Sequence, residues 1–361
     1  MPKTPSPTTV QSDESPSDLA HTGLARRTRA LVPGLFISIV LATLATIAGN
    51  HFRVIGAPVF AIVGGMLISS FVSKKQVLQA GIGFSSKSVL KGSIIVLGTG
   101  LSFREVVVTG VSSLPVLLGT LVIALVSAWL IGRWLLIDSD LTTLIGVGTA
   151  ICGASAIAAT DAVISAAESD VSYAISTIFF FNVTAVLTFP ALGHLMHLSS
   201  HAFGLWSGTA VNDMSSVVAA STVYSKAAAS FAVIVKLTRT LMIIPITIGL
   251  ASLRARSKAG RTPGIAPSRI ATVRKVFPVF IIWFLVAVFA NSMNWIASAW
   301  HPDLALVAGF MISVALGAIG MSSNFYEIRK MGARPLLMGG ALWILVSSSS
   351  LGLQMLSNHL F

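Results

Sequence analysis

Two stretches of this sequence look like copies of each other, with six of sixteen aligned positions identical: Gly148-Thr149-Ala150-Ile151-Cys152-Gly153-Ala154-Ser155, continuing to Val163, and Gly208-Thr209-Ala210-Val211-Asn212-Asp213-Met214-Ser215, continuing to Val223. Both are rich in Gly, Ser, Thr and Ala within an otherwise apolar region. Paired, Gly-interrupted hydrophobic segments in a membrane protein point to the binding site of a transporter. The alternative is close packing of helices through small residues.

The composition places the chain in a membrane. Of its 361 residues 54% are hydrophobic and 10% are charged, and the mean hydropathy is +0.86. A soluble domain carries about a quarter charged residues, so a polytopic membrane protein is expected. The single cysteine, Cys152, excludes an internal disulfide framework and a cysteine-based metal cluster. The net charge of +12 is spread over short loops, where it sets topology, so no nucleic-acid partner is expected.

Apolar runs of roughly 20 residues predict membrane segments. Residues 1–30 are polar and are expected to form a disordered cytoplasmic tail without a cleavable signal peptide. The first part of the membrane domain is then 31–253, followed by a basic cytoplasmic loop at 254–275 and the last three segments within 276–361. The eleven expected segments are 31–49, 58–72, 84–101, 113–136, 141–164, 172–196, 203–224, 227–253, 276–293, 303–321 and 334–356.

Basic residues between the segments predict the orientation, because short cytoplasmic loops carry an excess of Lys and Arg. With the N-terminus inside, only Arg53, Arg104 and Lys226 fall on the outer side. The inner set includes Lys87 and Lys91, which lie near one end of the third segment. The sequence therefore favours a cytoplasmic N-terminus and an external C-terminus.

A second internal sequence similarity predicts two inverted halves. A shift of 220 residues aligns Gly100 with Gly320, and Gly119 with Gly339. The two Gly/Ser-rich segments are either re-entrant hairpins or unwound helices that cross the membrane, and the sequence leaves both open. Either form places irregular backbone at membrane depth, which is tolerated only inside protein or along a cavity.

Four charged residues fall within the expected segments: Asp161, Asp213, Lys236 and Arg239. Intramembrane charges mark functional sites and need partners. Lys236 and Arg239 are three residues apart and share one helical face. They predict an anion site, or else an ion cluster with Asp213 that only holds the helices together. Asp161 is expected to couple an ion or to lie at the interface.

Together these features predict a site for a small anion. Broken helices expose backbone N–H groups at their positive ends, hydroxyls add donors, and Lys236 and Arg239 add charge. Asp213 and Asp161 are the candidate ion-coupling residues. The residues expected to contact substrate are Gly148, Thr149, Cys152, Gly153, Ser155, Gly208, Thr209, Asn212, Ser215, Ser216, Lys236 and Arg239.

Other polar residues point only weakly to chemistry. His194, His197 and His201 have helical spacing but end a segment without a nearby acidic ligand, so no metal site is expected. Asn182 and Asn291 line the path or hydrogen-bond between helices. No phosphate-binding Gly-rich loop occurs, so no ATP-driven pump and no cofactor are expected.

Several blocks resemble the YeiH-type family, whose name assigns it to sulfate export. They are Gly148 to Ala159, Asn212 to Ala220, Val235 to Arg239, and Gly317 to Met321 with Pro335-Leu336. The resemblance covers roughly residues 30 to 356, and departs from the family at Asp161 and Met214. It implies a bacterial inner-membrane secondary transporter built from inverted repeats, akin to cation–proton antiporters and bile-acid symporters, that exports an oxyanion such as sulfate or a sulfonate.

The sequence thus predicts an all-α transporter rather than an enzyme, with a small anion, a coupling proton or sodium ion and the bilayer as partners, and it is compatible with a homo-oligomer. The main alternative is a cation–proton antiporter that uses Asp213 and Asp161. A membrane enzyme that uses Cys152 or the histidines, and a passive channel, are further alternatives.

Overall fold

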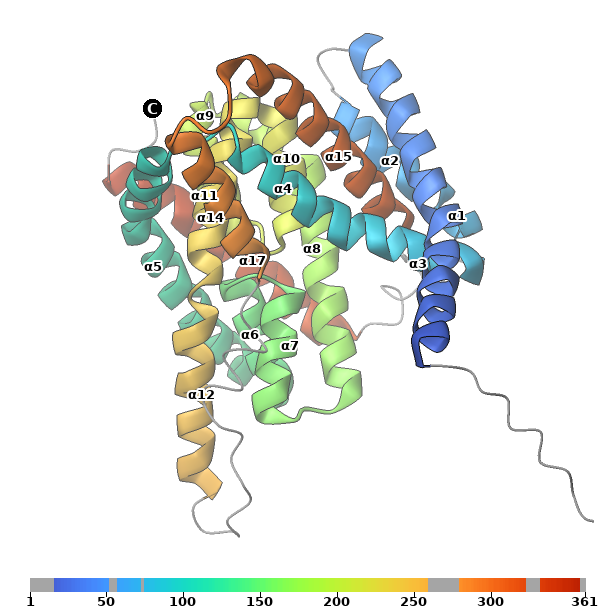
Figure 1. The fold of residues 1–361 in the computed structure, drawn as a ribbon. Coiled ribbons are helices and arrows are strands. Elements are labelled where there is room, and N and C mark those ends of the chain that lie inside the picture. Colours follow the sequence, from blue (N-terminus) through green and yellow to red (C-terminus); the bar gives the residue numbers. More distant parts are fainter. Residues whose placement is uncertain (1–15, 52–56, 73–74, 259–278, 323–331, 358–361) are drawn as a thin grey trace, which may run out of the picture.

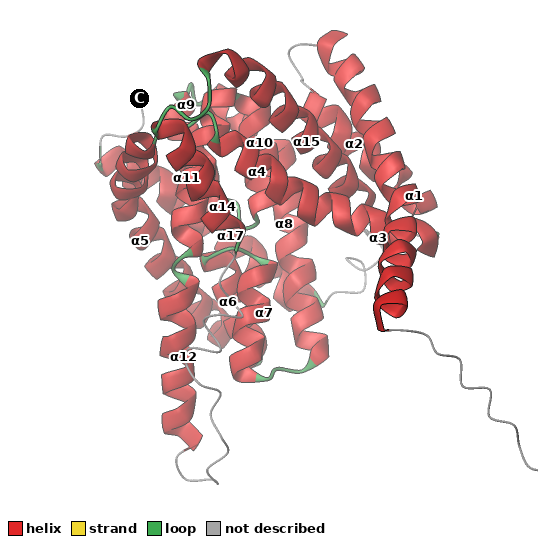
Figure 2. Ribbon diagram, viewed as in Figure 1, coloured by secondary structure: helices red, strands yellow, loops and turns green. Residues whose placement is uncertain are grey.

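The computed structural model describes residues 16–51, 57–72, 75–258, 279–322 and 332–357, with the side chains of 16–29 and 251–258 left aside. Within these ranges every regular element is a helix (Figure 2). The helices are α1 (Pro16–His51), α2 (Ala57–Val72), α3 (Gln76–Phe84), the π-helical turn η1 (Ser85–Val89), α4 (Leu90–Gly98), α5 (Phe103–Trp134), α6 (Ser139–Ala150), α7 (Ala154–Ile164), α8 (Glu168–Leu195), α9 (Ser200–Ala210), α10 (Met214–Tyr224), α11 (Lys226–Thr240), α12 (Ile243–Lys258), α14 (Phe280–Ser292), the 3-10 turn η2 (Ser298–Trp300), α15 (His301–Ser322) and α17 (Ala333–Leu356).

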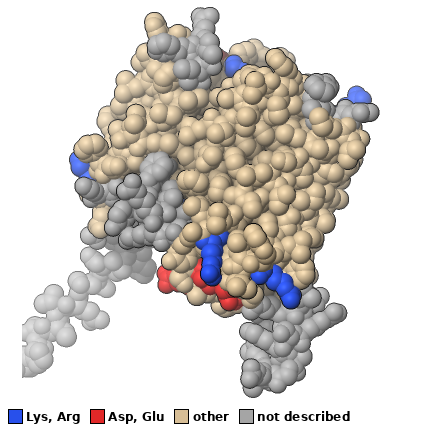
Figure 3. Space-filling model, turned by 180° about the vertical axis from the view of Figure 1, so that it is seen from behind, with Lys and Arg blue, Asp and Glu red and all other residues tan. Residues whose placement is uncertain are grey.

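The helices have the length and surface of a polytopic membrane protein, which confirms the expected fold class. In the described ranges seven helical stretches are long and apolar enough to span a bilayer, and shorter apolar helices accompany them. Figure 3 shows one face of the molecule on which a broad uncharged area lies above a lower edge with acidic and basic side chains. Such a band matches the hydrocarbon core of a bilayer.

Each Gly/Ser-rich segment forms a re-entrant helical hairpin. Ser200 begins α9 and Ser225 follows α10, and their hydroxyl oxygens lie 2.8 Å apart, so both ends of this hairpin are on one side. In the other hairpin, Leu141 at the start of α6 and Ile164 at the end of α7 share one apolar cluster. The sequence leaves open whether these segments are re-entrant hairpins or helices that cross the membrane, and the positions of the helix ends show hairpins.

The two hairpins enter from opposite sides. Helix α8 joins them, and its 28 residues measure about 42 Å at 1.5 Å per residue. Figure 1 shows α6 and α7 at the lower end of the molecule and α9 and α10 at the upper end. Their tips, the breaks at 151–153 and 211–213, therefore meet in the interior.

The remaining helices form a second group beside the hairpins. We call α1, α2, α3, α4, α14 and α15 the scaffold group, and α5 to α12 with α17 the hairpin group. Within the scaffold group, α2 and α15 approach so closely at Gly65 and Gly320 that a Cβ on either would overlap the other backbone. Small residues allow this approach between apolar helices.

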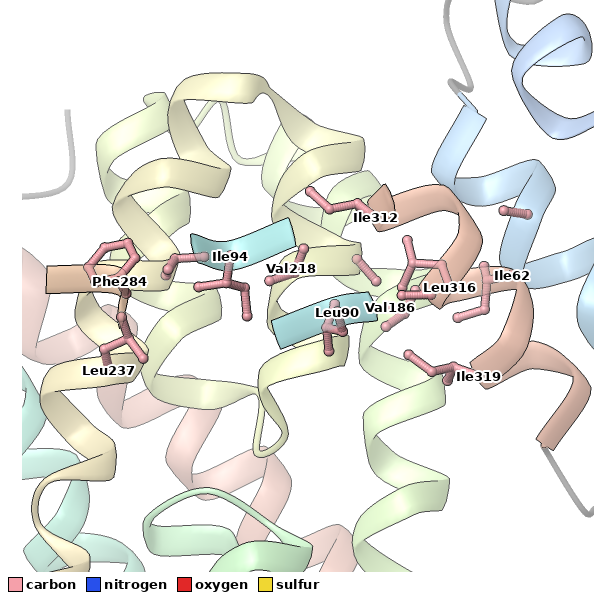
Figure 4. Packing of buried hydrophobic residues seen from close by; sticks show 14 of the residues in the cluster. Ile62, Leu90, Ile94, Val186, Val218, Leu237, Phe284, Ile312, Leu316 and Ile319 are labelled. Atoms are coloured by element: carbon pink, nitrogen blue, oxygen red, sulfur yellow. The ribbon is translucent and has the colours of Figure 1, made fainter. Parts of the chain in front are cut away.

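The two groups meet through an apolar cluster (Figure 4). From the scaffold group come Ile62, Leu90, Ile94, Phe284, Ile312, Leu316 and Ile319, and from the hairpin group Val186, Val218 and Leu237. Met214, one residue beyond the second break, packs against the same cluster. The tip of the second hairpin therefore touches the boundary between the groups.

Helices α5 and α17 pack antiparallel. Val116 in the first half of α5 clusters with Leu353 near the end of α17, whereas Ala128 in the second half of α5 clusters with Met338 near the start of α17. These are the two helices that the shift of 220 residues aligns, and they run in opposite directions.

Several boundaries differ from those expected, among them the start of α5, which is at Phe103 instead of residue 113. Helix α1 begins at Pro16, within the stretch 1–30 assigned to a tail, and α12 continues to Lys258, inside the expected loop 254–275 whose remainder is not described. The segment expected at 227–253 is interrupted between α11 and α12, at Leu241 and Met242. An unbroken apolar run conceals such an interruption from hydropathy alone.

The third segment also starts earlier than expected. Its helix begins at Gln76 instead of residue 84 and passes through the π-helical turn, so Lys87 and Lys91 lie in the middle of a 23-residue apolar helix and not at its end. Both side chains are exposed.

Candidate functional site

The two hairpin tips touch each other at Gly153 and Asp213. Gly153 has φ of +66° and ψ of −129°, a conformation that is essentially restricted to glycine. A Cβ placed on Gly153 would lie 3.6 Å from the Cβ of Asp213 and 3.7 Å from the carbonyl carbon of Asn212. The two similar segments thus meet where the helix of each is interrupted, at 151–153 and 211–213.

Helix α11 places two cations against the C-terminal ends of α6 and α9, the first half-helix of each hairpin. The Lys236 ammonium donates to the carbonyl of Ile151 and to that of Val211, each at 2.8 Å. Because the last carbonyls of a helix have no partner within it and carry partial negative charge, a cation there satisfies both the hydrogen bond and the charge.

Arg239 joins the same two ends one turn further along α11. Its Nε donates to the carbonyl of Ala150 at 2.7 Å and its Nη2 to that of Thr149 at 3.0 Å. Its Nη1 donates to the carbonyl of Thr209 in the other hairpin. Lys236 and Arg239 have no exposed surface, so in this conformation they are charged neighbours of the tips rather than open contacts for a solute.

The N-terminus of α10 is closed by side chains. Asp213 is its N-cap, and one carboxylate oxygen accepts hydrogen bonds from the backbone N–H and the hydroxyl of Ser215. The side-chain amide oxygen Oδ1 of Asn182, on α8, accepts from the N–H of Asn212 at 3.0 Å and from that of Asp213 at 3.4 Å. Asn182 therefore fixes the second break to the long helix.

The N-terminus of α7 is open. Its N-cap is Gly153, which has no side chain to cap the helix. Ala154 and Ser155 are exposed, and within the described residues their backbone N–H groups have no hydrogen-bond partner. This end of α7 presents free donors and the positive end of a helix dipole.

Two buried oxygen atoms beside the tips also lack partners in the described part of the chain. They are Thr149 Oγ1 and Asn212 Oδ1, and each residue is only 1% exposed. Buried polar atoms are almost always hydrogen-bonded, so an unpaired one calls for an explanation such as a bound water or ion. Both belong to the set that the sequence predicts.

The charges around the tips leave a positive excess. Two cations face two helix C-termini, each of about half a negative charge, and two helix N-termini of about half a positive charge each surround one carboxylate. With Asp213 ionised, the sum is about one positive charge. The arrangement therefore favours an anion over a cation.

The other predicted site residues lie around the tips or farther along the hairpins. Gly148 and Gly208 are packing positions, where a Cβ would come within 2.9 Å of Ile157 and within 2.8 Å of Val235. The hydroxyl of Thr209 lies 2.6 Å from that of Ser350 on α17. Cys152 and Ser216 are buried within the hairpins.

Asp161 is separated from the tips. It lies eight residues beyond Gly153, or about 12 Å along α7, and its carboxylate accepts from the N–H of Ala166 at 3.0 Å. It stabilises the turn into α8, which corresponds to the interfacial role that the sequence allows.

The histidines and the second asparagine lie outside the tips. His194 stacks on Tyr224 with ring centroids 4.3 Å apart, and His201 lies 3.6 Å from the ring of Phe231. Asn291 joins α14 to Leu101 and to His301. Among the described residues no three His, Cys, Asp or Glu side chains gather as metal ligands.

Two lysines were missed as candidate site residues. Lys87 and Lys91 are exposed in mid-helix, and the Lys91 ammonium lies 6.0 Å from the ring centroid of Phe280. Phe280 and Met214 both pack against the cluster between the two groups. Charges at this depth need either water or a polar partner. In the sequence, the two lysines could have been noticed because they lie four residues apart within an apolar run.

Known proteins match nearly the whole chain. The family model described as Conserved hypothetical protein 698 matches residues 33–339. The UPF0324 membrane protein of Streptococcus pneumoniae (strain ATCC BAA-255 / R6) is 42% identical over 330 residues, which cover 90% of this chain and 96% of that protein. The UPF0324 membrane protein of Streptococcus pyogenes serotype M18 is 40% identical over 332 residues, and that of Streptococcus agalactiae serotype V is 39% identical over 331 residues, each with the same coverage.

Proposed function

Since the chain belongs to the family described as Conserved hypothetical protein 698, whose matching members are UPF0324 membrane proteins, we propose that it is a secondary active transporter of a small anion. The family resemblance seen in the sequence is confirmed by these matches. The substrate class, an oxyanion such as sulfate or a sulfonate, is inferred from that resemblance together with the charges at the tips.

The open N-terminus of α7 is the observation that carries the proposal. Ala154 and Ser155 present free N–H groups and a hydroxyl beside the half-buried Asp213 and near two fully buried cations. Helix N-termini bind anions through these donors and their dipole. An oxyanion at Ser155 would complete the cap that Gly153 cannot provide.

Transport by alternating access is supported by the arrangement of the two groups. Much of their boundary is a cluster of apolar side chains that can slide over one another, and Met214 places the tip at this cluster. A hydrogen bond from the N–H of Phe103 on α5 to Oγ of Ser292 on α14 also crosses the boundary. The opposed hairpins and the antiparallel α5 and α17 fit inverted repeats, which exchange their roles between inward-open and outward-open states. We propose that the hairpin group carries the anion past the scaffold group.

Asp213 is the proposed coupling residue. Its carboxylate is the single acidic group described at the tips, and one of its oxygens has no hydrogen-bond partner in the described part of the structure. Protonation of this group would remove a negative charge from beside the anion. Binding of a proton or a sodium ion at Asp213 would therefore be coupled to binding of the anion.

The alternative is a cation–proton antiporter that uses Asp213 and Asp161. The partly exposed Asp213 favours it, whereas the roughly 12 Å of helix between Gly153 and Asp161 and the two buried cations oppose it. A pH-sensitive dye in vesicles distinguishes the two, because only the antiporter responds to pulses of sodium or potassium without an anion.

The basic residues at the ends of two helices support a proposed orientation. The end of α5 with Arg133 and the start of α17 with Arg334 lie on the side where the first hairpin enters, and short cytoplasmic loops are rich in basic residues. We propose a multi-pass protein of the bacterial plasma membrane with that side, and the N-terminus, in the cytoplasm.

Uptake of radiolabelled sulfate and of radiolabelled methanesulfonate into everted vesicles tests the proposal. Saturable uptake that depends on an imposed ion gradient is expected, and Asp213→Asn is expected to remove the gradient dependence. Asp303→Asn, an exposed carboxylate at the start of α15, is the matched control and should behave as the wild type. Unchanged gradient dependence in Asp213→Asn would remove its assigned role.

A further inference from the structure

A groove of about 480 Å³ lies between α5, α6 and α12, apart from the hairpin tips. Its deep end is walled by Leu125, Val147 and Ile246. These residues belong to the apolar cluster that also contains Ile151 and Cys152 of the first tip. The deep end of the groove therefore lies at Val147, one helical turn before the first break.

The outer end of the groove is polar and basic. Arg133 lines it together with Ser139 and Thr143 at the start of α6. The Arg133 side chain is exposed and makes no ion pair or hydrogen bond with another described residue. Although Asp138 and Asp140 are close in sequence, neither lines the groove, and Asp138 caps the N-terminus of α6.

Exposed tryptophans indicate the depth of this end. Trp129 is 59% exposed and lines the groove, and Trp134 is 81% exposed beside Arg133. Tryptophan gathers at the level of lipid headgroups. Leu125 lies eight residues from Arg133, or about 12 Å deeper along α5, which is within the hydrocarbon.

We propose that this groove binds one anionic phospholipid, with its phosphate at Arg133 and one acyl chain along Leu125, Ile246 and Leu250. The phosphate complements the unpaired guanidinium, which can hold it through two parallel hydrogen bonds. Basic pockets between membrane helices on the cytoplasmic side are suited to such headgroups. The apolar wall accounts for a chain that a free phosphate lacks.

The bound lipid would contact the first hairpin directly. Helix α6 forms one wall of the groove, and its terminal carbonyls are those held by Lys236 and Arg239. An acyl chain against Val147 would support α6 one turn before the break. The lipid therefore stabilises the hairpin in the position seen here, whatever solute the tips bind.

Native mass spectrometry of the delipidated full chain tests this site. Dioleoylphosphatidylglycerol is expected to bind more tightly than dioleoylphosphatidylcholine, and inorganic phosphate should not displace it. Arg133→Gln is expected to weaken phosphatidylglycerol binding about fivefold, the loss of one basic contact at a membrane surface, and to leave phosphatidylcholine binding unchanged. Arg104→Gln, exposed at the opposite end of α5, should change neither.

A second variant separates the acyl chain from the headgroup. Ile246→Trp narrows the groove and is expected to weaken both lipids while the preference for phosphatidylglycerol persists. Equal binding of the two lipids by the wild type, an equal loss in Arg104→Gln, or displacement by inorganic phosphate would each overturn the proposal. These outcomes do not depend on transport and leave the proposed function untouched.

Discussion

Lys236 and Arg239 lie one turn apart on α11, and each donates hydrogen bonds to carbonyls of both hairpins. Two half-helices that point their negative ends at each other would repel. Two cations between them turn this repulsion into attraction. The pair therefore joins the two hairpins through hydrogen bonds, and we call it the joint of the hairpins. Because it is held at the ends of α6 and α9, it also places its positive charge beside the tips.

Removing one of these cations should destabilise the protein. Lys236→Met leaves the buried carbonyls of Ile151 and Val211 without donors, and each unsatisfied group costs about 1–3 kcal/mol. We expect a clear fall in the melting temperature of the purified protein. Lys226→Met, at the exposed start of the same helix, is the control and should melt like the wild type; equal melting of both variants would contradict the assigned joint.

Arg239→Lys keeps the charge and loses the fork. Lysine has three donors at one atom, whereas the guanidinium reaches three carbonyls in two hairpins. We expect a smaller loss of stability than in Arg239→Gln, measured by thermal unfolding in detergent. If both variants lose the same stability, the charge contributes nothing and the geometry alone matters.

Gly153→Ala should impair the first tip. The backbone conformation at this position costs a residue with a side chain about 1–3 kcal/mol, and the added Cβ would press on Ile178 at 3.3 Å. Reduced anion uptake in vesicles and a lowered melting temperature are expected. Gly309→Ala is matched to it, since a Cβ there meets nothing within 4 Å on α15 and alanine favours a helix; this variant should be at least as stable as the wild type.

Lys87 and Lys91 are expected to gather the anion before it reaches the tips. Replacing both with Gln should raise the apparent KM of uptake at low ionic strength with little change in kcat, because exposed charges steer ligands over a distance that salt shortens. The difference should disappear at high salt. Lys226→Gln serves as the control, and a KM difference that salt does not change would exclude steering.

Much of the fold could be predicted because it depends on hydropathy. Apolar runs predict the long helices, and the two similar segments, 148–163 and 208–223, contain the two breaks at 151–153 and 211–213. The sequence could not distinguish hairpins from crossing helices, because both give the same apolar length. The distinction rests on contacts such as that between Ser200 and Ser225, which are distant in sequence.

The residues that gather at the hairpin tips could be predicted more readily than the contacts that they make there. The spacing of Lys236 and Arg239 placed both on one face of a helix. Their partners are backbone carbonyls, and because every residue has one, no sequence motif predicts which carbonyls they contact. Asn182 carried no signal beyond being polar in an apolar run, although it holds the second break. The sequence did not show how far Asp161 lies from the tips, because that distance depends on where α7 begins.

Protection of a cysteine at position 155 from alkylation tests most directly whether an anion binds between the tips. In Ser155→Cys, sulfate or methanesulfonate is expected to slow modification saturably, whereas Ala162→Cys, exposed two turns further along α7, should react at the same rate with and without anion; wild-type protein supplies the baseline of the buried Cys152. Equal rates at position 155 with and without anion, or equal protection at both positions, would contradict an anion site at the open end of α7.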